Sequence, residues 1–193
     1  VCANIFVILL LISVLGGLLQ HVCDQMPREL RERRAELQQQ PLTLLIPCYL
    51  PNEVEIMDDT IEHVMRRLEY AGPLTLIVCY NTPAPMAKES ELADRDGSAY
   101  PNGRTLRILR VENSTSKAEN LNAALEHVAT EKVVIYDADH HPDPQSLLIA
   151  MAAMEMHDVQ CVQGSTYLRT RPNFLAAYIN AEFFVTHFVF FPA

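Results

Sequence analysis

From residue 42 onward, short apolar runs alternate with segments of helical periodicity, and this alternation limits the possible folds more than any other feature of the sequence. Strands that alternate with helices form a mainly parallel sheet with helices on both faces. The sequence therefore predicts an α/β domain. The runs with the length and flanking residues of buried strands are Leu42–Ile46, Leu74–Cys79, Thr105–Val111, Lys132–Tyr136 and Val159–Val162.

Local signals predict where helices begin between these runs. Asn52 is expected to cap one helix, with Glu55 three residues later as its reciprocal partner. A second helix is predicted over residues 116–129, because Ser116 and Glu119 have the spacing of a capping box. These two helices would follow the first and third strands.

Proline and glycine predict the remaining boundaries. Pro47 is expected to end the first strand, and residues 81–104 are expected to form a long loop with room for a short helix. Asp143 is expected to cap a further helix whose first residue is Pro144. Residues 174–193 are predicted to form a helix packed on the domain, with a second membrane span as the alternative because the stretch is largely apolar.

Composition excludes some classes of protein. A length of 193 residues suffices for one domain with a substantial core. The formal net charge of −9 argues against a nucleic-acid-binding surface. The five cysteines form no Cys-x-x-Cys pair, which fits neither a zinc site nor a disulfide framework and indicates a reducing compartment.

The first 22 residues are predicted to form a transmembrane helix. Residues 1–19 are almost entirely apolar and would span ~29 Å, about the thickness of the hydrocarbon core. The alternative is a signal peptide, but the run is long for one and no small-residue cleavage site follows it. Residues 23–41 then form a juxtamembrane helical spacer. Arginines in that spacer predict that the chain beyond the membrane is cytoplasmic.

Two carboxylates one residue apart follow the fourth predicted strand. Side chains alternate along a strand, so Asp137 and Asp139 would point the same way and repel each other without a cation. Parallel sheets bind ligands outside the carboxyl ends of their strands. The pattern therefore predicts a metal site there, although an ordinary surface turn is the alternative.

A lysine in the first turn of the second predicted helix is the next signal. The helix dipole disfavours a cation at that position, so Lys117 indicates an anion that also binds at the helix start. The neighbouring hydroxyls and free N–H groups suit a diphosphate, whereas the alternative is a lysine on a solvated face. Asn120 and Asn122 are poor helix formers, which suggests that they make polar contacts.

Three motifs in this order resemble those of family 2 glycosyltransferases, and most closely those of membrane-bound, cellulose-synthase-like bacterial polysaccharide synthases. They are Ile46–Glu53, Lys117–Asn122 and Asp137–Asp139. The resemblance implies a Rossmann-like fold of the GT-A type over residues 42–193, with the C-terminal part of the domain truncated. It also implies a location in the bacterial inner (plasma) membrane with a cytoplasmic catalytic domain.

The resemblance implies a role for each motif residue. The chain would take a UDP-sugar as donor and a polysaccharide or a lipid-linked acceptor, with inversion at the transferred sugar. Asp139, together with Asp137, would bind Mg²⁺ or Mn²⁺, ions that prefer oxygen ligands and can bridge phosphate oxygens. The residues expected to contact the donor are Pro47, Tyr49, Glu53, Asn81, Lys117, Asp137 and Gln163.

The sequence departs from the family pattern in two ways. Many relatives end the second strand with an Asp-Asp pair that recognises uracil, whereas this chain has Asn81 in that region. The catalytic base and the Q-x-x-R-W motif of the family also do not occur before Ala193, so the fragment alone is expected to be inactive. A non-catalytic, membrane-tethered nucleotide-sugar-binding protein and a nucleotidyltransferase are the alternatives.

Overall fold

The structure is a computed structural model that describes residues 37, 39–164, 166, 168 and 173–185. The chain divides into two compact units, and the larger one covers residues 32–152. This unit contains every strand described and the predicted site loops after the first, second and fourth strands.

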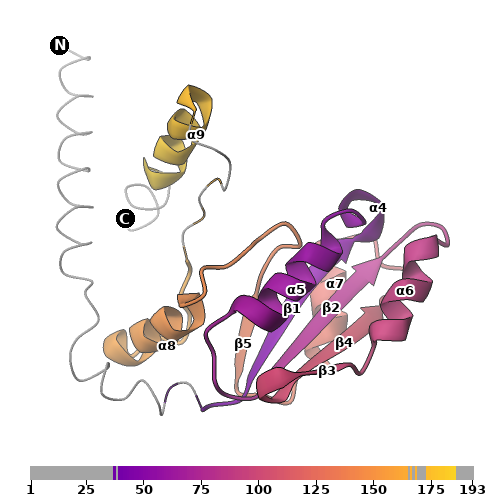
Figure 1. The fold of residues 1–193 in the computed structure, drawn as a ribbon, viewed down its shortest axis with the longest axis horizontal. Helices are drawn as coiled ribbons and strands as arrows, with labels where there is room; N and C mark the ends of the chain where they lie inside the picture. Colours follow the sequence, from indigo (N-terminus) through magenta and orange to yellow (C-terminus); the bar gives the residue numbers. More distant parts are fainter. Residues whose placement is uncertain (1–36, 38, 165, 167, 169–172, 186–193) are drawn as a thin grey trace. The chain divides into compact units, whose positions relative to one another are not determined.

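The larger unit is built on a five-stranded sheet with the order β3-β4-β2-β1-β5 (Figure 1). β1 pairs in parallel with β2 and β5, and β2 pairs in parallel with β4, whereas β3 is antiparallel to β4. The prediction of a mainly parallel sheet is therefore confirmed. The strands are β1 (Leu42–Tyr49), β2 (Leu74–Asn81), β3 (Ala99–Tyr100), β4 (Arg104–Arg110) and β5 (Lys132–Ile135).

Helices cover both faces of this sheet, as predicted. Figure 1 shows α5 crossing one face and α7 lying behind the other. Leu45, Ile77 and Cys79 pack with Ala124 of α7, and the alternate strand residues are buried on the opposite side. The helices are α4 (Leu50–Glu53), α5 (Met57–Arg67), α6 (Ala87–Arg95), α7 (Lys117–Leu125), α8 (Ser146–His157) and α9 (Phe174–Val185), with a 3₁₀ turn, η1 (Pro101–Gly103).

The prediction that Pro47 ends the first strand is wrong, because β1 continues to Tyr49. The backbone N–H of Tyr136 donates to the carbonyl of Leu45, so the odd-numbered residues of β1 face β5. Pro47 is the next residue on that side, and β5 has already ended at Ile135. The N–H that proline lacks therefore has no partner to lose, and a proline is tolerated in an interior strand.

The predicted cap of the first helix is also wrong. Asn52 lies inside the short helix α4, and the longer helix α5 starts separately at Met57 without a side-chain cap. Glu53, rather than Glu55, makes the reciprocal contact, because its Oε2 accepts a hydrogen bond of 2.8 Å from the backbone N–H of Tyr49.

The segment between β2 and β4 contains more regular structure than the expected loop. Helix α6, strand β3 and η1 all lie within it. Asn102 has a φ of 65° there, a left-handed conformation that asparagine tolerates better than most residues. The prediction left room for a short helix, and α6 fills it.

The start of α7 follows the prediction closely. Ser116 is the N-cap, its Oγ accepts a hydrogen bond of 3.2 Å from the backbone N–H of Glu119, and the reciprocal bond is also present. The helix ends earlier than predicted, at Leu125, because the backbone N–H of Val128 donates to the Leu125 carbonyl in a tighter turn.

The helix after the fourth predicted strand begins later than expected. Asp143 does not cap a helix at Pro144. Instead, its Oδ1 accepts a 2.9 Å hydrogen bond from the backbone N–H of Gln145, and α8 starts at Ser146. Asp143 thus forms a turn that leads into the helix.

The fifth predicted strand does not form. Residues 159–164 have no regular secondary structure, and Val159 and Val162 are exposed. A run of four residues, here with Gln160 inside it, has too little periodicity to distinguish a strand from a connecting segment. Gln163 therefore does not lie at a strand end, and it belongs to the second unit.

The predicted transmembrane helix over residues 1–22 lies outside the described residues, as does nearly all of the spacer over 23–41. Among the helices that the structure describes, none has both the length and the apolar character needed to span a bilayer. Within residues 174–193, a helix forms over Phe174–Val185, as predicted.

Candidate functional site

A pocket of about 550 Å³ lies at the carboxyl ends of β1, β2 and β5, beside the start of α7. This is the edge at which parallel sheets bind ligands, and strand order reverses there, because β2 and β5 lie on opposite sides of β1. The pocket is lined by Pro47, Cys48, Tyr49, Asn52, Glu53, Ile56, Asn81, Thr115, Ser116, Lys117, Asn120, Asp137, Ala138 and Asp139.

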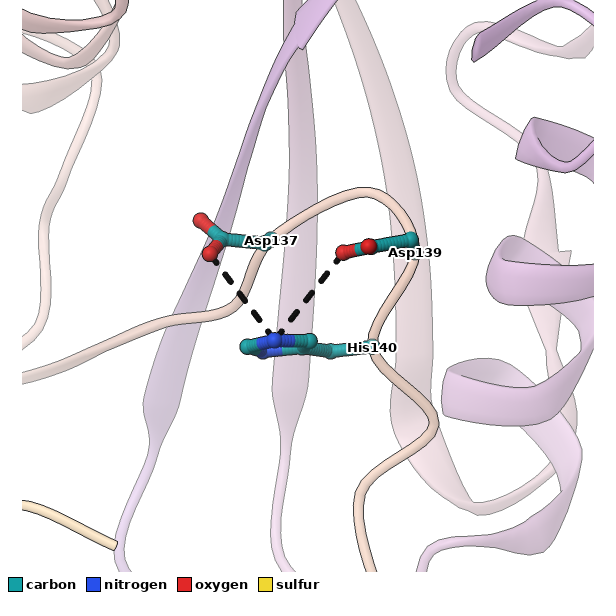
Figure 2. Close-up of side chains that lie close together, drawn as sticks. All are labelled: Asp137, Asp139 and His140. Atoms are coloured by element: carbon teal, nitrogen blue, oxygen red, sulfur yellow. Dashed lines mark ion pairs between the residues drawn. The ribbon is translucent and has the colours of Figure 1, made fainter. Parts of the chain in front are cut away.

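Three side chains that can ligate a metal meet at the end of β5. One ligand atom from each of Asp137, Asp139 and His140 lies within 4.8 Å of the others. Figure 2 shows the His140 imidazole between the two carboxylates, with its Nε2 at 3.8 Å from Asp137 Oδ2 and 3.9 Å from Asp139 Oδ1. Two carboxylates and an imidazole fit Mn²⁺ well, and the two carboxylates fit Mg²⁺.

The backbone between these carboxylates is anchored on α5. Ala138 is buried, and its carbonyl accepts a hydrogen bond of 2.6 Å from the Thr60 hydroxyl. The chain just beyond is held at two further points. His63 Nε2 lies 2.8 Å from the Pro142 carbonyl, and the ring of His63 stacks on that of His141 at 4.5 Å. The carboxylates therefore project from a fixed loop.

The start of α7 adds a cation to the pocket. The Nζ of Lys117 forms an ion pair with Oδ1 of Asp137, and both side chains are about half exposed. Ser116 and Thr115 stand beside it at the helix N-terminus. An anionic group placed here would meet the ammonium and the positive end of the helix dipole.

Glu119 has a structural role at the same helix start. Its Oε2 accepts hydrogen bonds from the backbone N–H groups of Thr115, at 2.6 Å, and Ser116, at 3.1 Å. These bonds, the one from Thr115 first, lower the pKa of the Glu119 carboxyl below its ordinary value. Glu119 thus shapes the loop in front of Lys117.

The end of β1 supplies a thiol, and the short helix α4 that follows supplies a third carboxylate. Glu53 turns back over Tyr49, whose side chain is exposed at the pocket. Burial, and then the nearby Glu53, raise the pKa of the Cys48 thiol. Cys48 stays protonated at neutral pH and is therefore unsuited to be a nucleophile.

Two buried asparagines connect the strand ends beneath the pocket. The Nδ2 group of Asn120 donates to the Cys48 carbonyl at 3.1 Å and to Asn81 Oδ1 at 2.8 Å. The Nδ2 group of Asn81 donates to the Ser114 carbonyl at 2.9 Å. This chain of amides connects the end of β1, the end of β2 and the loop that precedes α7.

Most of the predicted site residues lie together. The structure brings Pro47, Tyr49, Glu53, Asn81, Lys117, Asp137 and Asp139 to this one pocket. Gln163 is exposed in a segment without regular structure outside the larger unit.

Sequence reasoning gave too little weight to two residues. His140 directly follows the Asp-x-Asp motif, and that position was the signal available for it. Asn120 carried only the signal of a poor helix former in a helix. Its contacts reach residues 39 and 72 positions away, and local patterns do not reveal pairings of that kind.

Comparison with known proteins places the chain in context. Residues 39–191 match the family described as glycosyltransferase like family 2. No curated protein matches the chain. Among solved structures, the crystal structure of S. aureus TarS 1-349 is similar at 16% identity and a TM-score of 0.46, over 69% of this chain and 41% of that one.

A second similar structure is the mannosyltransferase PcManGT from Pyrobaculum calidifontis, solved in complex with GDP-Man and Mn²⁺. It has 22% identity and a TM-score of 0.48, over 80% of this chain and 44% of that one. The chain therefore spans less than half the length of either solved structure.

Proposed function

Since this chain belongs to the glycosyltransferase like family 2, we propose that it provides the donor-binding part of an inverting glycosyltransferase. The donor is a UDP-sugar, and the acceptor is a polysaccharide or a lipid-linked glycan. The protein is anchored in the bacterial inner membrane by residues 1–22, and the domain that begins at residue 42 faces the cytoplasm.

One observation carries this proposal. Asp137 and Asp139 line the pocket with His140 beside them, and Lys117 reaches the same place from the start of α7, where it pairs with Asp137. A nucleoside diphosphate bound with a divalent cation needs this combination: ligands for the cation, and a fixed positive charge for the phosphate oxygens.

The residues divide the work of donor binding. Asp137, Asp139 and His140 would hold Mg²⁺ or Mn²⁺, which when bound stabilises the negative charge that builds on the departing diphosphate. Lys117 contributes a point charge to the same diphosphate, and the positive end of the α7 helix dipole favours its binding there. Tyr49 and Glu53 line the pocket at the end of β1, where the nucleoside would lie.

The proposal is tested with the full-length protein in native membranes. UDP-sugar hydrolysis or transfer that requires added Mg²⁺ or Mn²⁺ is the expected result, and its absence with every common UDP-sugar would refute the catalytic proposal. UDP binding without any turnover would favour the non-catalytic nucleotide-sugar-binding alternative. The family match leaves the nucleotidyltransferase alternative without support, because that alternative rested only on the Asp pair and the lysine.

A further inference from the structure

The hydrogen bonds of Asn120 and Asn81 beneath the pocket have a defined direction. Each of their donors is a side-chain NH₂ group, and their acceptors are the Cys48 carbonyl, the Asn81 amide oxygen and the Ser114 carbonyl. Asn120 is 1% exposed and Asn81 is 7% exposed, so solvent can replace few of these bonds. Reversing either amide would place oxygen against oxygen and lose a hydrogen bond.

Asn120 also carries two free-energy costs that its hydrogen bonds must offset. Asparagine is a poor residue for a helix interior. Its Oδ1 is buried and has no partner among the described residues, and an unsatisfied buried acceptor costs about 1–3 kcal/mol. A buried residue with these two costs is better explained by what it positions than by the stability it adds.

We propose that Asn120 and Asn81 are positioning residues that set the shape of the donor pocket, and that position 81 requires an amide rather than a carboxylate. This inference rests on the proposed function and deepens it. Asn120 holds the Cys48 backbone next to Tyr49, and Asn81 holds Ser114 two residues before the Ser116 cap of α7. The pair thereby fixes the nucleoside side of the pocket relative to the phosphate side.

A carboxylate at position 81 would break this arrangement. One oxygen of Asp could still accept from Asn120, but the other would face the Ser114 carbonyl, where Asn81 now donates at 2.9 Å. Two acceptors in contact at a buried position repel each other, and burial adds a desolvation cost to the new charge. An aspartate that would recognise a base elsewhere in the family is therefore predicted to disturb the pocket in this chain.

The test is a pair of isosteric variants, Asn81→Asp and Asn120→Asp, with Asn122→Asp as the control. Asn122 is exposed on the same helix, two residues beyond Asn120. UMP binding is measured by calorimetry in EDTA, so that the metal ligands do not contribute. At neutral pH we expect Asn81→Asp and Asn120→Asp to weaken UMP binding at least about tenfold, which corresponds to the loss of one buried hydrogen bond, and Asn122→Asp to bind UMP as the wild type does.

The pH dependence distinguishes positioning from a general loss of structure. The pKa of a buried carboxyl that faces a carbonyl oxygen is raised, so Asp at position 81 should protonate at roughly pH 5–6. Its O–H can then donate to the Ser114 carbonyl, and UMP affinity should return to within about threefold of the wild type, since that bond is restored. Equal affinities of Asn81→Asp and the wild type at neutral pH would overturn the inference, as would a loss of binding that acid does not reverse.

A ligand-free measurement separates this inference from the proposed function. Urea unfolding of Asn81→Asp should show a stability deficit at neutral pH that shrinks at about pH 5, while Asn122→Asp should show none. If the wild type binds neither UMP nor UDP, the proposed function fails, and the unfolding series still decides whether the amide pair needs an amide at 81. If Asn81→Asp does not fold, Asn120→Ala serves instead: UMP affinity equal to that of the wild type would refute the positioning role, and weaker binding with folding intact would support it.

Discussion

The two ends of the parallel sheet use charge in opposite ways. At the amino end, Arg104 begins β4 with only 3% of its surface exposed. Its terminal nitrogens donate to the carbonyls of Val64, Met65, Leu68 and Tyr70 at 2.5–3.2 Å. These carbonyls lie at and just beyond the last turn of α5, where a helix leaves its acceptors without intrahelical partners.

At the carboxyl end, the charges are exposed and can change partners. The side chains of Lys117 and Asp137 are 55% and 45% exposed, and that of Asp139 is 71% exposed. Their contacts are ion pairs with one another rather than bonds to backbone. Surface ion pairs contribute at most about 1 kcal/mol, so a ligand can displace them at little cost.

The comparison distinguishes a buried charge that stabilises the fold, Arg104, from exposed charges that are available to bind a ligand. The two terminal nitrogens of Arg104 are satisfied by the backbone of its own protein, whereas its buried Nε has no partner among the described residues. The pocket charges are held near one another by a rigid frame but not neutralised by it. Substitutions should therefore affect stability at the amino end and ligand affinity at the pocket edge.

The largest effect is expected from Arg104→Met. This change removes the donor to four buried carbonyls and should lower the free energy of unfolding by about 3 kcal/mol. The measurement is urea unfolding. Arg107→Met is the matched control in the same strand. Arg107 is half exposed, and its one ion pair among the described residues is with Asp96 at 3.5 Å, so its effect should stay within about 0.5 kcal/mol. If Arg104→Met lowered the free energy of unfolding no more than Arg107→Met does, the two ends of the sheet would not differ in how they use charge.

Asp139→Asn is expected to affect ligand binding and to leave stability almost unchanged. An exposed carboxylate adds little to stability, so the urea midpoint should barely change. UDP affinity in the presence of Mn²⁺ should fall at least about tenfold, because a charged ligand of the cation is lost. Calorimetric titrations with Mn²⁺ and with EDTA measure this, and the variant should match the wild type in EDTA. Unchanged affinity with Mn²⁺ would remove Asp139 from the metal site.

Lys117→Met should change the affinity for the diphosphate and the affinity for the metal in different ways. Without its ammonium, UDP affinity should fall about threefold to tenfold, as expected for one charge-assisted contact. Mn²⁺ affinity of the nucleotide-free protein should instead stay equal or rise up to about fivefold, since the ion pair that occupies Asp137 is gone. Manganese binding is followed by electron paramagnetic resonance of the free ion. A fall in both affinities would contradict the assignment of Lys117 to the diphosphate.

The smallest effect is expected from Glu119→Gln. Hydrogen bonds from Thr115 and Ser116 lower the folded-state pKa of this carboxyl below its ordinary value of 4.5. Its contribution to stability is therefore present above 4.5 and is lost as the pH falls through the folded-state pKa. The urea midpoint of Glu119→Gln should be slightly below that of the wild type at neutral pH, and the two should converge in acid. If the difference between the two urea midpoints grew as the pH fell, the stabilising role of the ionised Glu119 carboxylate would be refuted.

Local patterns in the sequence were sufficient to predict the parallel sheet and most of the pocket. The alternation of apolar runs and helical segments predicted β1, β2, β4 and β5, and ordered motifs at strand ends predicted that Asp137, Lys117 and Asn81 would meet. Carboxyl ends of parallel strands share one edge, so knowing the strands was enough to group their loops.

Contacts between distant parts of the chain could not be predicted in this way. The bonds from Arg104 to the end of α5 and from Asn120 to Cys48 join residues far apart in sequence, and no local periodicity encodes them. The fifth predicted strand, Val159–Val162, failed for the related reason that a short apolar run takes its structure from its neighbours. The prediction of Asn52 as a cap was wrong because a cap is defined by its backbone conformation. The residue type favours that conformation but does not determine it.

The proline in β1 has a consequence for how the pocket stays open. In a parallel ladder, the N–H of residue 47 would donate to the carbonyl of Tyr136, one step beyond the bond from the Tyr136 N–H to Leu45. Proline has no hydrogen to give, so β1 offers no donor to the chain at the point where β5 has ended at Ile135. The segment Asp137–Asp139 therefore leaves the sheet without forgoing a ladder bond to β1. Both carboxylates then line the pocket that a cation and a nucleotide would fill.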